Sequence, residues 1–456
     1  MSARSADGGF DLDLLDRLVE KARAAGAEQA EAYGERSESR RIKVFKGEVE
    51  ELTSSTRRGV GLRVFMGEHV GHASTSDLSD EALDDLVART LAHAAVVDPD
   101  PDVVLVEGGQ PLPEIGIYDE RLHDIDVPGR IDLALRTEQA ALEADPRIKL
   151  VETTMYADAE ASVGIVSTSG LRQGFREGHS YLFLYALAEQ DDQVETGVAY
   201  SVGRYPGELD PEGCGREAAE RAARLLGATP CPSMKATAVL EPFVGADVLN
   251  VLGAALTADA VQKQRSLFAA LEGKQVASSV VSLLDDGRHP EGLASAPFDG
   301  EGSPTQRTPL IEAGVLQGFL YDARTAHKAG RRSTGNGGRG SYQGIPSVHP
   351  TNLILAGEQT PVGEVISGIE HGVLVTDAVG VHSGANPVSG EFSVGISGIL
   401  IENGRLTRPL REVTLAGDIL SMLKGIAAIG DDARWIPSGS VLMPTIAIEG
   451  MSIAGT

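Results

Sequence analysis

Residues 298–336 read FDGEGSPTQRTPLIEAGVLQGFLYDARTAHKAGRRSTGN, and the rest of the chain is organised around this stretch. The segment DGEG at residues 299–302 predicts a turn, because glycine adopts backbone conformations that other residues avoid. Two strands are expected next, at residues 308–311 and 315–321, and the glycine between them indicates a hairpin. The stretch therefore predicts a turn followed by a β-hairpin.

A short helix is expected after the hairpin. Residues 322–329 have Asp322 as an N-cap, and Gly330 is placed to end the helix. A glycine-rich segment at residues 333–338 closes the stretch. The loop GNGGRG at residues 335–340 resembles a phosphate-binding loop, but the preceding strand and following helix that such a loop requires are missing from the pattern. We therefore interpret it as a flexible loop, or as one that allows close approach of the backbone.

Composition limits the class of protein. The chain has 456 residues, which predicts two or three domains, and its 42% hydrophobic content can build a sizeable core. The net charge of −26 argues against nucleic-acid binding, because an acidic surface repels phosphates. Cys214 and Cys231 are too few for a disulfide framework, and the sequence shows neither a signal peptide nor a run of about 18 apolar residues. We therefore expect a cytoplasmic protein that does not enter a membrane.

Sequence patterns divide the chain into three parts. Residues 1–100 read as a helix, a β-meander and a second helix. Residues 101–232 read as a helix, four strands and an alanine-rich helix, up to a boundary signal in the segment ATPCP. Residues 233–456 are rich in glycine and in β-type runs. The expected fold is α+β, with N-terminal mixed α/β layers built on antiparallel sheets and a β-rich C-terminal domain that carries a few helices.

Individual elements follow from the periodicity of apolar residues. Helices are expected at residues 10–25, 80–96, 128–144, 216–226, 245–256, 260–271, 362–367 and 415–426. Strands in the first two parts are expected at residues 29–35, 40–45, 49–55, 60–66, 69–74, 148–156, 161–168, 179–187 and 195–202, with turns at residues 169–170 and 177–178.

Several further blocks follow the opening stretch in order. Together they resemble the third domain of the TldD/PmbA (TldE) family, a group of bacterial and archaeal metallopeptidase subunits. Several independent blocks in order are far more specific than one short motif. The N-terminal two thirds fit the family more loosely. The blocks are PTNL at residues 350–353, GVLVTD at 372–377, NPVSGEFS at 386–393, IENG at 401–404 and IEGMSIAG at 448–455.

The resemblance also indicates which branch of the family this chain is similar to. The metal-binding subunit carries HExxxH on the first helix of the last domain, where two histidines approach zinc and the glutamate polarises the bound water, and a cysteine near the C-terminus completes the site. An ungapped match places Leu249, Asn250 and Ala254 where His, Glu and His belong. No cysteine follows Cys231. The chain resembles the metal-free TldE/PmbA branch, so we expect no catalytic residue and no metal ligand in it.

Candidate substrate-binding residues lie in the opening stretch and in the loop after it: Asp299, Glu301, Arg332, Asn336 and Arg339. One residue separates the two carboxylates, Asp299 and Glu301. Their position in a turn accounts for them, and a role in acid–base catalysis is the alternative interpretation. Arginines beside the glycine-rich loop could hold a peptide carboxylate by paired hydrogen bonds. The alternative interpretation is that they are solvated loop arginines.

Two other candidate sites are less specific. Glu370, His371 and His382 could hold a metal across a turn, but their setting is also typical of a helix end that faces solvent. Ser389 lies near an acid, yet the sequence places no histidine to activate it, and a turn accounts for the same residues.

The resemblance implies a function for the chain. We expect a non-catalytic subunit of a metallopeptidase heterodimer that degrades or processes unstructured peptides, with zinc and catalytic residues supplied by a TldD-like partner. An unfolded peptide would pair with a β-edge through main-chain hydrogen bonds. The alternative is a metal-free homodimeric peptide-binding or regulatory protein, and a hydrolase with an unrelated site of its own ranks last.

Overall fold

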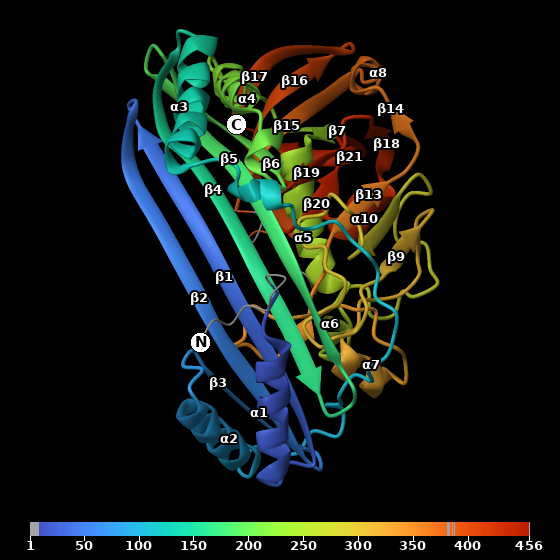
Figure 1. Ribbon diagram of the computed structural model, residues 1–456. Helices are drawn as coiled ribbons and strands as arrows, with labels where there is room; N and C mark the ends of the chain where they lie inside the picture. Colours follow the sequence, from blue (N-terminus) through green and yellow to red (C-terminus); the bar gives the residue numbers. More distant parts are fainter. Residues whose placement is uncertain (1–8, 381–383, 385, 387, 456) are drawn as a thin grey trace.

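The computed structural model describes residues 9–380, 384, 386 and 388–455 (Figure 1). The N-terminal half is built on one six-stranded antiparallel sheet with the order β3-β2-β1-β4-β5-β6. The two N-terminal parts expected from the sequence therefore both contribute strands to a single sheet. Its strands are β1 (Gln29–Phe45), β2 (Glu48–Met66), β3 (His69–Thr75), β4 (Ile148–Ser167), β5 (Arg172–Gln190) and β6 (Gln193–Gly203).

Four helices cover one face of this sheet. The pair α1 (Leu12–Ala24) and α2 (Asp80–Ala94) packs at one end, and the pair α3 (Val127–Ala144) and α4 (Pro211–Ala223) packs at the other (Figure 1). Each helix begins after an aspartate or serine whose side chain accepts a hydrogen bond from the first turn. The opposite face, here called the inner face, is turned toward the C-terminal domain.

Several strands are longer than the sequence pattern predicts. The two strands expected within residues 29–45 are one strand, because the polar residues between them pair with β2 on one side and with β4 on the other. The turn expected at residues 177–178 is wrong: Gly178 lies inside β5, opposite Glu160 of β4. Pairing on both sides keeps these residues extended where local composition favours a break.

The C-terminal domain places α5 (Pro242–Ala255) among two larger sheets. One sheet has the order β10-β9-β8-β13-β20-β19, and the other has the order β14-β18-β21-β17-β16-β15-β7. One large apolar core fills the domain. The α+β class with a β-rich C-terminal domain is thus confirmed. The strands are β7 (Met234–Leu240), β8 (Ser282–Asp286), β9 (Arg307–Glu312), β10 (Val315–Leu316), β11 (Gly337–Gly338), β12 (Ser347–Val348), β13 (Leu353–Ala356), β14 (Gln359–Thr360), β15 (His371–Val379), β16 (Glu391–Glu402), β17 (Arg405–Asp418), β18 (Ile426–Gly430), β19 (Arg434–Ile436), β20 (Val441–Met443) and β21 (Ile446–Ala454).

The opening stretch folds largely as its sequence predicts. The hairpin of β9 and β10 turns at Ala313 and Gly314, both at positive φ. Asp322 caps α7 (Ala323–Ala329), and Gly330 ends it in the left-handed conformation. The second expected strand forms only the short β10 at residues 315–316 and an isolated bridge between Leu320 and Thr257. The remaining short helices are α6 (Ala258–Gln262), α8 (Val362–Ser367), α10 (Ile419–Lys424), η1 (Glu120–His123) and η2 (Pro206–Glu208).

Two helices expected in the C-terminal domain are shorter than predicted. The helix expected at residues 260–271 ends with α6, because the chain reverses at Gln264, whose φ is 55°. The helix expected at residues 415–426 begins only after Asp418, which caps α10, and the residues before it extend β17. Among the described residues, no helix has the length and apolar composition needed to cross a lipid bilayer.

Candidate functional site

Helix α5 contains the residues that the resemblance aligns with the metal-binding helix of the TldD-type subunit. It begins after β7 and packs into the core through alternating small and apolar residues. Leu249 is buried, Asn250 donates a hydrogen bond to the Ser438 carbonyl at 3.1 Å, and Ala254 is exposed. No group of three or more His, Cys, Asp or Glu placed to hold a metal occurs within the described part of the chain. The residues on α5 therefore do not fit a zinc ion, and the helix faces a small cavity with an apolar lining.

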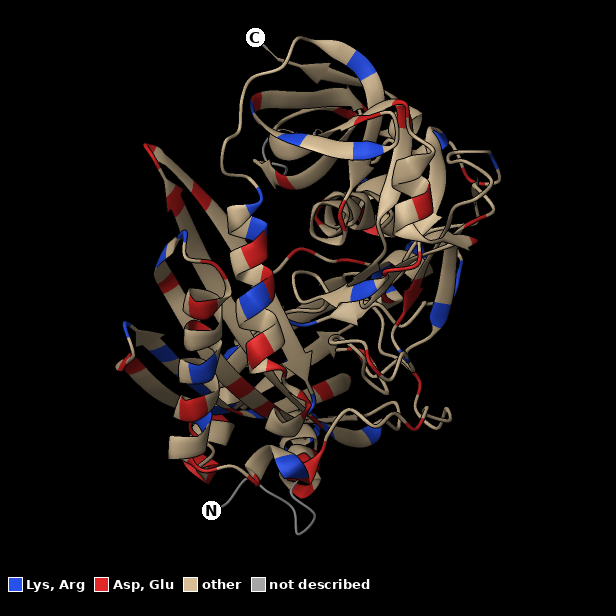
Figure 2. Cartoon of the chain, turned by 90° about the horizontal axis from the view of Figure 1, so that it is seen from above, with Lys and Arg blue, Asp and Glu red and all other residues tan. Residues whose placement is uncertain are grey.

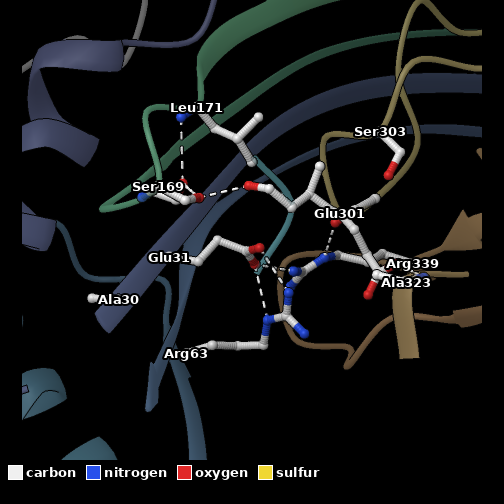
Figure 3. A network of polar contacts seen from close by, with 12 residues as sticks. Ala30, Glu31, Arg63, Ser169, Leu171, Glu301, Ser303, Ala323 and Arg339 are labelled. Atoms are coloured by element: carbon white, nitrogen blue, oxygen red, sulfur yellow. Dashed lines mark hydrogen bonds and ion pairs between the residues drawn. The ribbon is translucent and has the colours of Figure 1, made fainter. Parts of the chain in front are cut away.

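A second candidate site joins the two halves of the molecule. Its members are Glu31 on β1, Arg63 on β2, and Asp299, Glu301 and Arg339 from the C-terminal domain; we call them the charge cluster (Figure 3). All five side chains are buried. Charged side chains are rarely buried unless they are paired, so this cluster needs internal partners for each group.

Glu31 lies at the centre of the charge cluster. Arg63 donates to both of its carboxylate oxygens, at 3.0 and 2.7 Å. Arg339 donates to the same carboxylate from the other side, and Figure 3 shows both guanidinium groups pointing at it. Burial alone would raise the pKa of Glu31, but the two arginines outweigh it and hold that pKa below its ordinary value. Glu31 is therefore a fixed negative charge that ties the sheet to the C-terminal domain.

Asp299 and Glu301 carry the acidic side of the cluster. The Asp299 carboxylate accepts the backbone N–H groups of Glu301, Ser303 and Gly337 at 2.8 to 3.0 Å. Glu301 accepts the N–H of Ala323, the first residue of α7, at 2.7 Å. Burial raises the pKa of Asp299 to about 7, and burial together with the Asp299 charge raises the pKa of Glu301 to about 8. The pair can hold a proton at neutral pH.

Asn336 lies beside the cluster and links it to a fourth buried acid, Asp285. Its side-chain amide donates to Asp285 at 2.7 Å and to the His349 carbonyl at 3.0 Å. Thr351 also donates to Asp285 through its backbone and its hydroxyl, both at 2.7 Å. Burial raises the pKa of Asp285 to about 6 despite these bonds. The side-chain amide of Asn336 therefore connects the glycine-rich loop to β8.

The structure brings together four of the five residues predicted to bind substrate. The Arg339 side chain is only 1% exposed, whereas Arg332, seven positions earlier, faces solvent. The four buried residues form hydrogen bonds with other groups of the protein, so a peptide would reach them only if these contacts opened. Substrate contact by all five residues stays a prediction.

The sequence did not point to Glu31 and Arg63. Both lie in strands. On β1 one face carries Ala30 and Ala32 and the other carries Glu31 and Tyr33, and on β2 Arg63 stands between the buried Leu62 and Val64. The available sequence signal was that Glu31 and the aromatic Tyr33 share the face of the strand opposite to Ala30 and Ala32. A charged and an aromatic residue on that face indicate that it contacts another part of the protein. Nothing local indicates a partner such as Arg339, which is 308 residues away in the chain.

The weaker candidates are placed as follows. Glu370 and His371 are both exposed, and His371 opens β15, where it pairs with Glu402, rather than ending a helix. His382 lies outside the described residues. The Ser389 hydroxyl accepts the N–H of Glu391 at 3.3 Å, as the turn interpretation predicts.

Comparison with known proteins identifies the family. The PmbA/TldA metallopeptidase domain 1 matches residues 30–94, the central domain matches residues 120–226, and the C-terminal domain matches residues 233–455. Metalloprotease PmbA of Escherichia coli O157:H7 is 29% identical over 421 residues, which cover 89% of this chain and 88% of the relative. In Haemophilus influenzae the PmbA homolog is 29% identical over 440 residues, covering 95% of this chain and 94% of the relative, and the TldD homolog is 26% identical over 459 residues, covering 94% of this chain and 93% of the relative.

Solved structures agree with this assignment. A Thermotoga maritima protein described as a candidate modulator of a DNA gyrase superposes with a TM-score of 0.90 at 29% identity, covering 97% of this chain and 99% of that one. TldE from Thermococcus kodakarensis superposes with a TM-score of 0.89 at 22% identity, covering 97% and 100%, which shows the shared fold. The chain belongs to the PmbA/TldD metallopeptidase family, on its PmbA (TldE) branch.

Proposed function

We propose that this chain is the metal-free subunit of a cytoplasmic, two-subunit metallopeptidase that degrades or processes unstructured peptides. A TldD-like partner would supply the zinc ion and the catalytic residues. The proposal is supported by α5: the family fold surrounds this helix, and the resemblance aligns Leu249, Asn250 and Ala254 with the ligand positions of the metal subunit. Leucine and alanine cannot bind a metal ion or activate water.

The inner face of the N-terminal sheet supports a role in holding peptide. On β5, Leu182 and Leu184 are buried under the helices, whereas Tyr181, Phe183 and Tyr185 alternate with them and stay partly exposed. Such an alternation places the aromatic rings on the inner face. Aromatic side chains offer large contact areas to peptides of varied sequence.

A chain of aromatic contacts connects this face to α5. The rings of Phe183 and Tyr200 lie 5.1 Å apart between centroids, and Tyr200 stacks on Phe243 of α5 at 5.9 Å. A peptide bound along the inner face would thus approach α5. We expect this subunit to shape the cavity and orient the peptide, while bond cleavage takes place at the partner's zinc.

The test is a peptidase assay with an unstructured, fluorescence-quenched peptide. The chain alone, a TldD-like partner alone and the purified mixture are compared. The proposal predicts cleavage by the mixture and none by this chain, with a complex of both chains on size-exclusion chromatography. Cleavage by this chain alone would contradict the proposal. A chain that binds the peptide but never the partner would favour the metal-free homodimeric peptide-binding or regulatory protein.

A further inference from the structure

The first half of β2 is an open edge of the N-terminal sheet. β2 pairs with β1 along its whole length, but β3 pairs with it only from Val60 to Met66. No other described strand pairs with residues 48–58 on the side away from β1. Figure 1 shows β2 along the outer margin of the sheet, with the short β3 at its lower end. We call residues 48–58 the β2 edge.

The β2 edge is long and uncovered. Every residue in it is exposed except Ser55, which is half-buried, so neither face is packed against another element. At about 3.4 Å per residue the edge extends over roughly 37 Å. It contains no proline, and its register with β1 is unbroken from Arg58 to Glu51. Unpaired N–H and C=O groups along such an edge are a template for another strand.

Charges of opposite sign are separated along this edge. It reads EVEELTSSTRR, with Glu48, Glu50 and Glu51 at one end and Arg57 and Arg58 at the other. In Figure 2, by contrast, acidic and basic bands alternate along the helices. Charges on an edge strand can prevent aggregation by repelling a second copy of the same edge. This repulsion requires that like charges lie opposite each other when two edges meet. On the β2 edge, acidic and basic residues are at opposite ends, so an antiparallel second copy would bring unlike charges together.

Antiparallel alignment of two β2 edges makes them complementary. With Thr53 at the two-fold axis, Glu48 of each copy lies opposite Arg58 of the other, and Glu51 lies diagonal to Arg57. Both spacings lie within the reach of long side chains. The centre of the edge contains small hydroxyl residues that present no bulk or charge to a neighbouring strand. Parallel alignment in register would instead place acid on acid.

The charged groups on the edge are available for such pairing. Neither Arg57 nor Arg58 forms an ion pair within 4.0 Å with any residue that the structure describes; Arg57 acts at longer range on Glu35, and Arg58 on Asp77. Glu51 pairs with Arg41 at 3.2 Å and Glu50 pairs with Lys43 at 2.7 Å, but all four side chains are between 30% and 53% exposed. An exposed pair of this kind is worth little and can rearrange at small cost.

We propose that two copies of this chain associate through antiparallel pairing of their β2 edges, so that two six-stranded sheets become one continuous sheet. The occupant of the edge is a second copy because the charge pattern is complementary to itself. This inference does not rest on the proposed peptidase function, and it leaves α5 and the inner face free for other partners. Salt weakens the association, because exposed charges orient the two strands.

A charge-swap experiment tests the proposal by sedimentation velocity over a concentration series. The all-acidic variant Arg57→Glu/Arg58→Glu and the all-basic variant Glu48→Lys/Glu50→Lys/Glu51→Lys should each lose the wild-type dimer. An equimolar mixture of the two should restore it, which shows that both variants are folded. The control Arg405→Glu changes an exposed charge on β17 and should leave the dimer intact.

Three results would overturn the proposal. One is a wild-type chain that stays monomeric over the whole concentration range. Another is a dimer that neither edge variant disrupts. The third is that the edge variants fail to bind a TldD-like partner while their self-association is unchanged. That result would assign the β2 edge to contact with a different chain.

Discussion

Helix α5 and the charge cluster lie in the same chain and contrast sharply. α5 is the helix that the resemblance aligns with a metal-binding helix, but Leu249, Asn250 and Ala254 stand at the aligned positions. The charge cluster has a dense set of ionisable groups but no access to solvent. Neither position in the fold nor chemical character is sufficient for catalysis, because a catalytic group needs both. In this chain we therefore expect the cluster to govern stability and α5 to govern shape.

The largest effect should come from Arg339→Ala. This change removes a buried guanidinium that bonds to Glu31 and to the carbonyls of Gly300 and Gly344. It leaves buried polar groups without a partner, so we expect the free energy of unfolding to fall by about 3–5 kcal/mol in urea titrations. Arg332→Ala, at an exposed position of the same segment, should change it by less than about 0.5 kcal/mol. Equal effects of the two changes would remove the distinction between buried and exposed arginines.

Gly337→Ala should have the next largest effect. An added methyl group at this position would lie 2.5 Å from a carboxylate oxygen of Glu301, inside the charge cluster. Overpacking of this kind typically costs about 1–3 kcal/mol, measurable as a lower midpoint of thermal unfolding. Gly340→Ala is the matched control, because nothing lies within 4 Å of its added methyl group. A neutral Gly337→Ala would mean that the cluster is more loosely packed than described.

The free energy of unfolding should depend on pH through the buried acid pair Asp299 and Glu301. Burial raises the pKa of Glu301 from 4.5 to about 8, so the folded chain binds this proton more tightly than the unfolded chain does. Its contribution to stability is therefore present at low pH and is lost as the pH rises from about 4.5 through about 8.

The variant Glu301→Gln tests this directly. It should flatten the decline in the free energy of unfolding over that pH range, by on the order of 1 kcal/mol for each pH unit. Glu312→Gln, at an exposed position of the β9–β10 hairpin, should keep the wild-type slope. If Glu301→Gln keeps that slope too, the acid pair does not titrate as its burial implies.

The smallest effect is expected on α5. Ala254→His places one imidazole at an exposed helical position, so the free energy of unfolding should change by less than about 0.5 kcal/mol. Elemental analysis should find no stoichiometric zinc, because zinc sites in proteins use three or four protein ligands. Tight zinc binding by this single variant would show that the other ligands are already present.

Local sequence signals were sufficient for parts of the fold. The hairpin at Ala313 and Gly314 and the caps of α7 at Asp322 and Gly330 depend on residues within a few positions of one another. The length of β1 could not be read locally, because its polar middle is held extended by strands on both sides. Tertiary pairing overrides a local preference there.

The candidate site was predictable only in part. Asp299, Glu301, Asn336 and Arg339 stood out because they lie within one glycine-rich stretch, and the structure places them close together. Their burial against Glu31 depends on the fold of the whole chain. Sequence alone cannot separate a buried arginine from a solvated one when the buried partner is hundreds of residues away.

The most direct test of the central claim is a measurement of zinc. The chain and a TldD-like partner are purified separately and as a complex, and metal content is determined by elemental analysis. We expect no stoichiometric zinc in this chain and one zinc ion per complex of the two chains. Stoichiometric zinc bound to this chain alone would contradict the account and would return attention to Glu370 and His371.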